Sequence, residues 1–276
     1  MNRHATNDYV LGHANHELER LVSQGAFFGQ LTEQLLRAAG LAPGMHVLDV
    51  GCGAGDVSFL AASLVGPRGS VLGVDRSSEA VALATQRAAA ARLTNLRFEV
   101  HDANELVRSR QFDAVVGRLV LMYFFEPARV LRRLTRLTVP GGIIAFHELD
   151  GGCTLSEPHV PLYAECVSNI FETLRRSRAH PSMGLQLVQT FRQAGLPEPA
   201  TMAHTRLGTA SDPAIFEQLA SIVRTLAPAM EKLGIASIAE LGLDTLAARL
   251  RHAVRAADAT IGAPLFVGAW AHNIVT

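Results

Sequence analysis

Cysteines, net charge and long hydrophobic runs are scarce or missing in this sequence. Its 276 residues contain only three cysteines, an odd number too small for a disulfide framework, which favours a reducing compartment. Its 25 basic residues balance 25 acidic ones, so no charge excess indicates a nucleic-acid or membrane partner. The most apolar stretch, 115–125, is interrupted by Arg118 and is too short to cross a bilayer. The polar start, Met1–Asp8, lacks the apolar core of a secretion signal. We therefore expect a cytoplasmic protein.

The residues that are present fit an ordinary globular enzyme, with 49% hydrophobic and 18% charged side chains. Apolar residues recur at helical spacing over 13–39, and Gly40 follows as a typical helix end. Pro43 and Gly44 then predict a turn, after which the pattern changes to short apolar runs.

Strand and helix patterns alternate after that turn. We expect strands at 47–50, 70–74, 96–100, 113–116 and 143–146, and helices at 57–64, 79–91 and 127–137. This alternation predicts an α/β fold with a doubly wound parallel sheet, whose binding crevice lies beyond the carboxyl ends of the strands.

The alternation of strand and helix patterns becomes less regular after Asp150. Helical patterns cover 161–178, 185–194, 213–232 and 238–257, and short strands are expected at 201–207 and 265–269, the last completing the sheet. We expect a single domain, 1–276, built from an N-terminal helical lid (1–40), a core (41–150), and a segment (151–276) that ends the sheet and forms a helical cap.

The chemistry-bearing motif is the run from Asp49 to Asp56, DVGCGAGD, at the end of the first predicted strand. Its glycines allow a tight turn and a close approach to a ligand. A nicotinamide dinucleotide site starts in the same way but needs a small third residue beside the diphosphate. Asp56 stands there instead, and its charge would repel a diphosphate at the helix N-terminus. S-adenosylmethionine has no phosphate and carries an ammonium and a sulfonium, so acids near the loop favour this cofactor.

Two further acids follow later strands. Asp75 ends the second strand, where a carboxylate can accept from two ribose hydroxyls, although nicotinamide enzymes share that feature. Asp102, followed by Ala103, comes after the third strand, where it can accept from the adenine amine. A lone acid after a strand is often only a turn residue, but acids after three successive strands indicate one ligand site.

The stretch from Gly40 to Asp150 resembles the class I S-adenosylmethionine-dependent methyltransferases, in their ubiquinone/menaquinone-type small-molecule branch. The resemblance rests on VLDVGCGAGD, VLGVDRS, FEVHDANEL, FDAVVGRLVLMYFFEP and VPGGIIAFHELD. It implies a Rossmann-like methyltransferase sheet, mostly parallel with the last strand antiparallel, and S-adenosylmethionine as cofactor, leaving S-adenosylhomocysteine as product. The N-terminal YVLGHANHELERLVSQGAFF also resembles this branch, in which a leading helix folds over the cofactor.

The resemblance also implies roles for individual residues. The methionyl part would lie along Asp49, Gly51, Cys52, Gly53 and Asp56; the ribose on Asp75; the adenine beside Arg76, Asp102 and Ala103; and the rest of the cofactor over Arg118 and Leu119, with Tyr9 and Gln24 as closing contacts.

Methyl transfer from a sulfonium needs mainly an aligned acceptor, and a general base only where the acceptor must lose a proton. His147 and Glu148, at the end of the fifth strand, are the predicted bases, and Tyr123 is a predicted substrate contact. No metal-ligand spacing is present. Apolar cap helices indicate a small, hydrophobic or aromatic substrate that undergoes C-, O- or N-methylation. The alternatives are an NAD(P)-dependent oxidoreductase and a non-catalytic cofactor-binding module.

Overall fold

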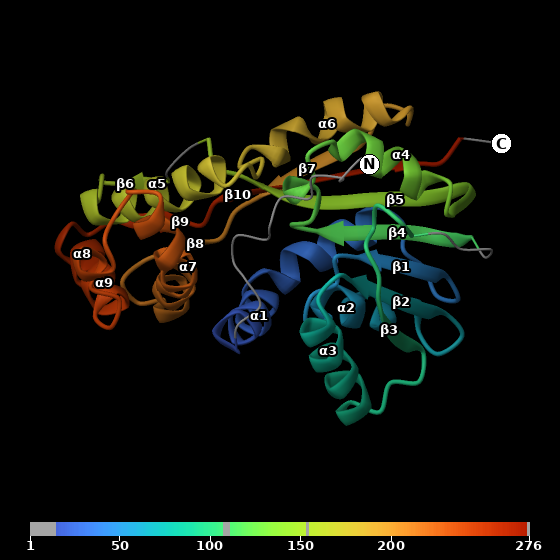
Figure 1. Cartoon of the computed structure of the whole chain (residues 1–276), viewed down its shortest axis with the longest axis horizontal. Coiled ribbons are helices and arrows are strands. Elements are labelled where there is room, and N and C mark those ends of the chain that lie inside the picture. The colour runs from blue at the N-terminus through green and yellow to red at the C-terminus, as the bar shows by residue number, and fades with distance from the viewer. Residues whose placement is uncertain (1–14, 107–110, 153–154, 275–276) are drawn as a thin grey trace.

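A seven-stranded sheet forms the centre of the computed structural model, which describes residues 15–106, 111–152 and 155–274 (Figure 1). The strand order is β3-β2-β1-β4-β5-β10-β7. The strands are β1 (His46–Val50), β2 (Ser70–Asp75), β3 (Leu96–Val100), β4 (Phe112–Arg118), β5 (Thr138–Asp150), β7 (Ala200–His204) and β10 (Leu265–His272). All neighbours pair in parallel except β10, which is antiparallel to both β5 and β7.

Helices cover both faces of this sheet. One face packs against α1 (Asn15–Ala38), α2 (Asp56–Val65) and α3 (Ser78–Ala90), which share a buried apolar cluster with β1 and β4. The other face packs against α4 (Pro127–Thr135) and α6 (Met183–Ala194), whose buried leucines meet Ile144 and Phe146 of β5. The doubly wound α/β fold predicted from the sequence is confirmed, with its last strand antiparallel.

Some expected boundaries were wrong for local reasons. The turn expected at Pro140–Gly142 does not separate two elements but lies inside β5 as an irregularity, where Gly141 has a φ of 76° and the pairing of β4 with β5 shifts register. The helix expected over 238–257 is two helices, α8 (Ile238–Leu241) and α9 (Leu246–Ala256), because Gly242 adopts a left-handed conformation that ends α8. Strand β10, the last strand in the chain, joins the sheet as expected and lies between β5 and β7.

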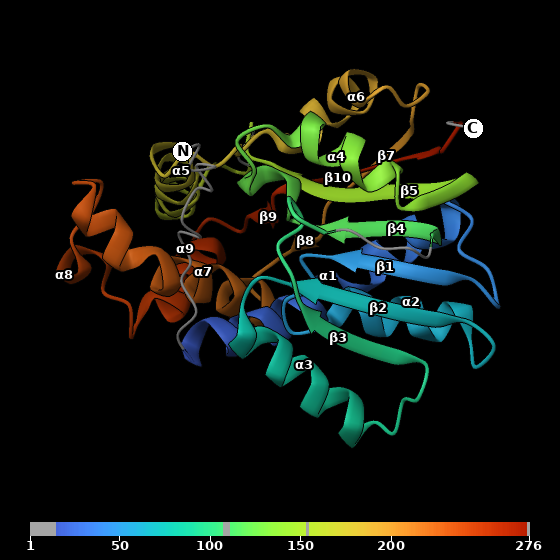
Figure 2. The same cartoon turned by 45° about the vertical axis from the view of Figure 1, so that its right-hand side comes forward.

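A cap of helices lies beyond the sheet, on the side toward which the arrowheads of β1 and β4 point (Figure 2). It contains α5 (Pro161–Arg176), α7 (Pro213–Lys232), α8 and α9, with a small sheet of β6 (Ser156–Glu157), β9 (Thr260–Gly262) and β8 (Leu207–Gly208). Because α1 contacts α2 and α7, it connects the core with the cap. The short helix η1 (Leu121–Tyr123) follows β4 on the same side.

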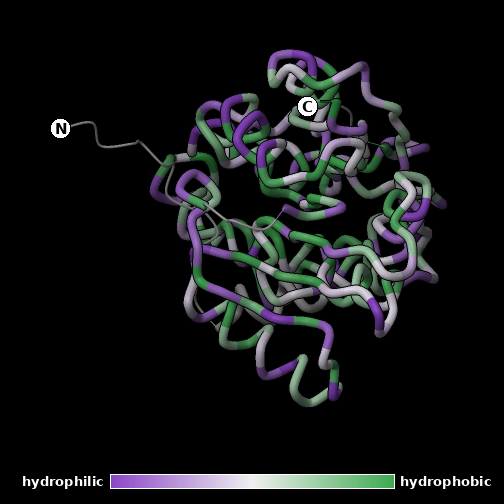
Figure 3. The backbone as a smooth tube through the Cα atoms, turned by 90° about the vertical axis from the view of Figure 1, so that its right-hand side faces the viewer, coloured by the Kyte–Doolittle hydropathy of each residue, from purple (hydrophilic) through white to green (hydrophobic). Residues whose placement is uncertain are grey.

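Hydrophobic stretches run through the middle of the molecule and hydrophilic ones gather toward its periphery (Figure 3). The larger buried cluster continues from the sheet into α5, α7 and α9, so core and cap share one apolar interior. Within the described ranges, no helix has the length and apolarity needed to cross a membrane.

Candidate functional site

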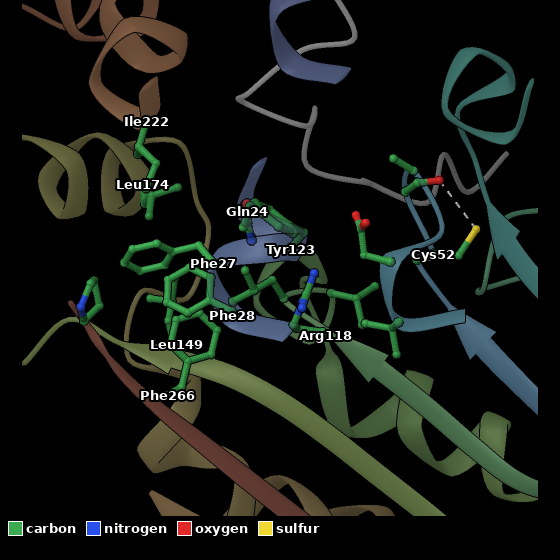
Figure 4. Close-up of a pocket in the computed structure, with 18 of the residues that line it drawn as sticks. Gln24, Phe27, Phe28, Cys52, Arg118, Tyr123, Leu149, Leu174, Ile222 and Phe266 are labelled. Carbon is green, nitrogen blue, oxygen red and sulfur yellow. Dashed lines mark hydrogen bonds between the residues drawn. The ribbon is translucent and has the colours of Figure 1, made fainter. Parts of the chain in front are cut away.

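One cavity of about 230 Å³ lies between the carboxyl ends of the strands and the cap. Its core side is formed by the ends of β1, β2 and β4, and its other walls by α1, α5, α7 and β10. In the view of Figure 4, Gln24 and Tyr123 lie between the loop at Cys52 and the aromatic side chains of Phe28 and Phe266. The cavity therefore has a polar half, over the sheet, and an apolar half, under the cap.

The glycine-rich loop after β1 begins the polar half. Gly51, Gly53 and Gly55 all have positive φ, at 67°, 51° and 92°, a conformation that side chains other than glycine rarely adopt. Gly51 is doubly required, since a Cβ there would lie 2.9 Å from the Cβ of Val120. The loop thus passes close to the segment after β4, and Gly51 and Gly53 both line the cavity.

Asp75 lies beside this loop with both carboxylate oxygens held. Oδ2 accepts from the backbone N–H of Gly53 and Oδ1 from that of Ser77, each at 2.9 Å. These two bonds fix the carboxylate and leave it lone pairs for further donors. Asp75 lines the cavity, so it can accept from a pair of vicinal hydroxyls.

The three residues predicted to lie beside the adenine are also found at the cavity. Arg76, Asp102 and Ala103 line the cavity near the ends of β2 and β3. Asp102 accepts from the backbone N–H of Asn104 at 2.7 Å through Oδ1, which fixes its side chain in a turn.

Asp56 is the first residue of α2 and lines the cavity. Arg87 of α3 pairs with it at 2.9 Å and donates a second hydrogen bond to the carbonyl of Ala54. The guanidinium also lies 5.0 Å from the centre of the Phe59 ring. The first turn of α2 therefore carries a carboxylate paired with an arginine, where a dinucleotide-binding loop would carry a small uncharged residue.

Asp49 does not line the cavity with the other acids. It is buried below the loop, where Ser58 donates a hydrogen bond to its Oδ2 at 2.5 Å. Burial raises the pKa of Asp49 to about 7, opposed by the Ser58 hydrogen bond and by the charge of Arg118. Its geometry supports a role beneath the loop rather than contact with the methionyl part.

His147 and Glu148 also lie below the cavity floor and do not line it. His147 Nδ1 lies 3.3 Å from Thr32 Oγ1, and its ring meets Phe266 edge-on at 5.0 Å. Burial lowers the pKa of His147 to about 3, aided by Arg118 and His204. Their proposed action as general bases stays a prediction without geometric support.

Glu148 is fully buried and accepts from two backbone N–H groups through Oε1, that of Leu121 at 2.8 Å and that of Val120 at 3.0 Å. Burial raises the pKa of Glu148 to about 8, opposed by hydrogen bonds from the backbone of residues 120–122. The carboxyl group is thus held by the chain that follows β4.

A sequence profile of a family described as a methyltransferase domain matches residues 41–195, more than half of the chain. The chain belongs to this methyltransferase family. Family membership agrees with the glycine loop, with Asp75 and with Asp56, and it favours S-adenosylmethionine over a nicotinamide dinucleotide as the cofactor.

Two named relatives each match a little less than half of this family member. An arsenite methyltransferase of Halobacterium salinarum is 34% identical over 129 residues, which are 46% of this chain and 33% of that protein. A demethylmenaquinone methyltransferase of Shouchella clausii is 32% identical over 123 residues, 44% of this chain and 50% of that protein. The chain thus spans half or less of the length of these relatives.

Solved structures extend the likeness to the whole fold. A S-adenosylmethionine-dependent methyltransferase from Aquifex aeolicus superposes with a TM-score of 0.51 at 17% identity, over 88% of this chain and 89% of that one. The YcgJ protein from Bacillus subtilis gives a TM-score of 0.54 at 19% identity, over 87% and 98%. At such identities the likeness concerns the fold alone.

The remaining predicted contacts divide into those placed at the cavity and one outside the described residues. Gln24, Cys52, Arg118, Leu119 and Tyr123 all line the cavity. Tyr9 lies outside the described residues. Arg118 donates from Nη1 to Thr32 Oγ1 at 3.1 Å, so β4 and α1 meet at the cavity floor.

The sequence predicted that apolar residues of the cap helices α5 and α7 could line a pocket, but it did not predict the contributions of α1 and β10 to the apolar half. Its aromatic walls come from α1, α5 and β10, with aliphatic side chains of α5 and α7 between them (Figure 4). They are Phe27, Phe28, Tyr163, Val167, Ile170, Phe171, Leu174, Ile215, Leu219, Ile222, Leu226 and Phe266. The helical spacing of apolar residues predicted the apolar faces of α5 and α7. The same sequence pattern is expected whether such a face packs against other helices or lines a cavity. Phe27 and Phe28 belong to the helical pattern over 13–39, which does not show that they reach the cavity, and the segment 262–264 has no periodic pattern.

Proposed function

We propose that this protein transfers a methyl group from S-adenosylmethionine to a small, largely apolar organic molecule. One observation carries the proposal: a single cavity joins the glycine loop and the acids of the core to an apolar chamber under the cap. A methyltransferase needs both compartments side by side, since the methyl group must pass directly from donor to acceptor.

The polar half suits the cofactor in its hydrogen-bonding groups and its charge. The loop would take the methionyl part at the backbone of Gly51 and Gly53, Asp75 the ribose hydroxyls, and Asp102 the adenine amine. Bound there, the cofactor supplies an electrophilic methyl group on a sulfonium, from which the thioether is a good leaving group. The bound carboxylate of Asp56 suits a ligand with positive charge and no phosphate.

The apolar half fits the acceptor. Among its described lining residues, the polar side chains are Gln24, Tyr123, Tyr163 and Gln218, and none is an acid, a lysine or a histidine. Tyr163 already donates its hydroxyl to the carbonyl of Gly262. Such walls favour a neutral, hydrophobic or aromatic molecule with few polar groups.

The residues of the chamber would catalyse by orientation and by excluding water. Alignment of two bound reactants can supply about 7–11 kcal/mol of the barrier. Without an acid or histidine on the described apolar walls, the acceptor atom should be nucleophilic without first losing a proton, as the nitrogen of a neutral amine is.

Calorimetry with S-adenosylhomocysteine tests the cofactor half. We expect one site per chain, a rise in Tm with the ligand, and no comparable rise with NAD⁺ or NADP⁺. Absence of binding at millimolar S-adenosylhomocysteine would remove the proposal. Incubation with methyl-labelled S-adenosylmethionine and a panel of naphthols, quinols and aromatic amines tests the acceptor half, where we expect label only in organic-soluble products.

A further inference from the structure

We infer that Glu148 is a positioning residue, which holds the segment Leu119–Phe124 at the junction between the two halves of the cavity. The importance of this junction for methyl transfer rests on the proposed function. The contacts that hold the segment do not depend on the proposed function, because they are made within the chain itself.

The segment begins in an unfavourable conformation. Leu119, directly after β4, has a φ of 55°, although it is not a glycine. A residue held in this region costs about 1–3 kcal/mol and persists only where its surroundings fix it. One such fixing contact is the backbone N–H of Leu119, which donates to the carbonyl of His147 at 2.9 Å.

Glu148 supplies the next two contacts. The residues after Leu119 enter helix η1, and the first N–H groups of a helix have no partners within it. Val120 precedes η1 and offers no side-chain cap. Oε1 of Glu148 takes that place, since it accepts from the N–H groups of both Val120 and Leu121. Consecutive residues of β5 thus hold the segment, one by its backbone carbonyl and one by its side chain.

The held segment contacts both halves of the cavity. Leu119, Val120, Tyr123 and Phe124 line it. Val120 also packs so closely on the glycine loop that a Cβ at Gly51 would overlap its side chain. A shift of η1 would therefore move the wall of the acceptor chamber and release the loop that would carry the cofactor.

The same contacts argue against proton transfer by Glu148. Oε1 is occupied by two N–H groups, and Oε2 is buried without a hydrogen-bond partner in the described part of the chain. Neither oxygen faces the cavity, because Glu148 does not line it. Burial raises the pKa of Glu148 to about 8, so the group is mainly protonated near neutral pH, whereas a base must be ionised.

Hydrogen exchange followed by mass spectrometry tests the inference without any substrate. Glu148→Gln keeps an acceptor oxygen at the same place, and Glu148→Met keeps the volume but removes that acceptor. We expect the peptide covering 118–124 to exchange at least about tenfold faster in Glu148→Met, a factor that corresponds to about 1.4 kcal/mol. Glu148→Gln should exchange as the wild type does, and so should the control Glu126→Ala, which removes an exposed carboxylate near the same segment.

Unchanged exchange in Glu148→Met, or equally fast exchange in Glu148→Gln and Glu148→Met, would overturn the inference. If Glu148→Met does not fold, Glu148→Asp makes the same comparison, because it draws the carboxylate back by one methylene group.

A second arm separates positioning from base catalysis. With an acceptor from the labelling panel, a positioning role predicts that Glu148→Gln retains turnover within about threefold, whereas Glu148→Met loses affinity for S-adenosylhomocysteine and for the acceptor. Loss of turnover in Glu148→Gln with both affinities intact would instead assign Glu148 as a base. If the wild type binds no S-adenosylhomocysteine, the proposed function fails, while the exchange experiment still decides the role of Glu148.

Discussion

Gly25 of α1 packs directly on the carboxylate of Asp56, so that a Cβ built at position 25 would lie 2.6 Å from Asp56 Oδ2. A side chain at position 25 would have to displace the Asp56 carboxylate or move α1 away from it. Asp56 is itself held by Arg87, so α1, α2 and α3 meet at this one carboxylate. The approach of α1 to the glycine loop therefore depends on an absent side chain.

Gly25→Ala should push α1 away from the loop and weaken the binding of S-adenosylhomocysteine, because Gln24, the neighbouring residue, lines the cavity. We expect a dissociation constant at least about tenfold higher, or about 1.4 kcal/mol, measured by calorimetry. Gly29→Ala in the same helix is the matched control. A Cβ at Gly29 meets nothing within 4 Å, so that variant should bind normally and gain about 0.5–1 kcal/mol of stability from helix propensity. Equal affinities in the two variants would contradict the packing described.

Asp75→Asn should also weaken cofactor binding. Both carboxylate oxygens accept from backbone N–H groups, of Gly53 and Ser77, so an amide must turn its NH₂ toward one of those donors. Loss of hydrogen bonds to a charged acceptor, about 1.5–3 kcal/mol each, should raise the dissociation constant of S-adenosylhomocysteine at least tenfold. Asp244→Ala, at an exposed position of the cap, should leave it unchanged. Normal affinity in Asp75→Asn would show that the ribose is bound elsewhere.

The sequence allowed prediction of the core site because local rules determine that part of the fold. Glycines at positive φ and acids after successive strands sit where the chain itself brings them, so Gly51, Asp75 and Asp102 line the cavity as expected. Asp49 and His147 are also next to those strand ends, but strand side chains alternate between faces. The sequence does not say which face meets the ligand, and both side chains are buried beneath it.

The apolar half of the cavity was harder to predict from the sequence because it depends on tertiary packing. Phe27 and Phe266 are far apart in the chain and reach the same cavity only once α1 and β10 have been placed. Glu148 is a similar case, since its partners at Val120 and Leu121 belong to a short helix that no periodicity announces. From the sequence, Glu148 at the end of a strand was therefore predicted to be a base, although in the structure its contacts are those of a helix cap.

The raised pKa of Glu148 predicts a loss of stability at alkaline pH. Its pKa rises from an ordinary value of 4.5 to about 8 in the folded chain, so the folded state binds more protons than the unfolded state between these values. Stability then falls as pH increases across that window and levels off above it. Thermal unfolding at pH 5, 7 and 9 should show a smaller fall in Tm for Glu148→Gln than for the wild type. Parallel curves would mean that Glu148 is ionised in the folded protein throughout.

His147 should act in the opposite direction, at acid pH. Burial lowers its pKa from 6.5 to about 3, so the unfolded state binds more protons between these values. Stability should be lost as pH falls through this window. His147→Gln, which keeps a polar group near Thr32 without a titratable ring, should lose less stability between pH 7 and pH 4. Because His147 lies outside the cavity, the affinity of the His147→Gln variant for S-adenosylhomocysteine should stay normal.

Ile222 tests the apolar half without touching the cofactor half. This residue of α7 lines the cavity but is only half-buried, so a glutamate there can reach solvent and the protein should still fold. A carboxylate on that wall must lose part of its hydration when an apolar molecule fills the chamber. We therefore expect Ile222→Glu to raise the dissociation constant of 1-naphthol for the S-adenosylhomocysteine complex at least about tenfold. Binding of S-adenosylhomocysteine itself should not change, and Ile222→Leu should resemble the wild type in both titrations. A loss of cofactor affinity in Ile222→Glu would show that the two halves of the cavity are not separate compartments.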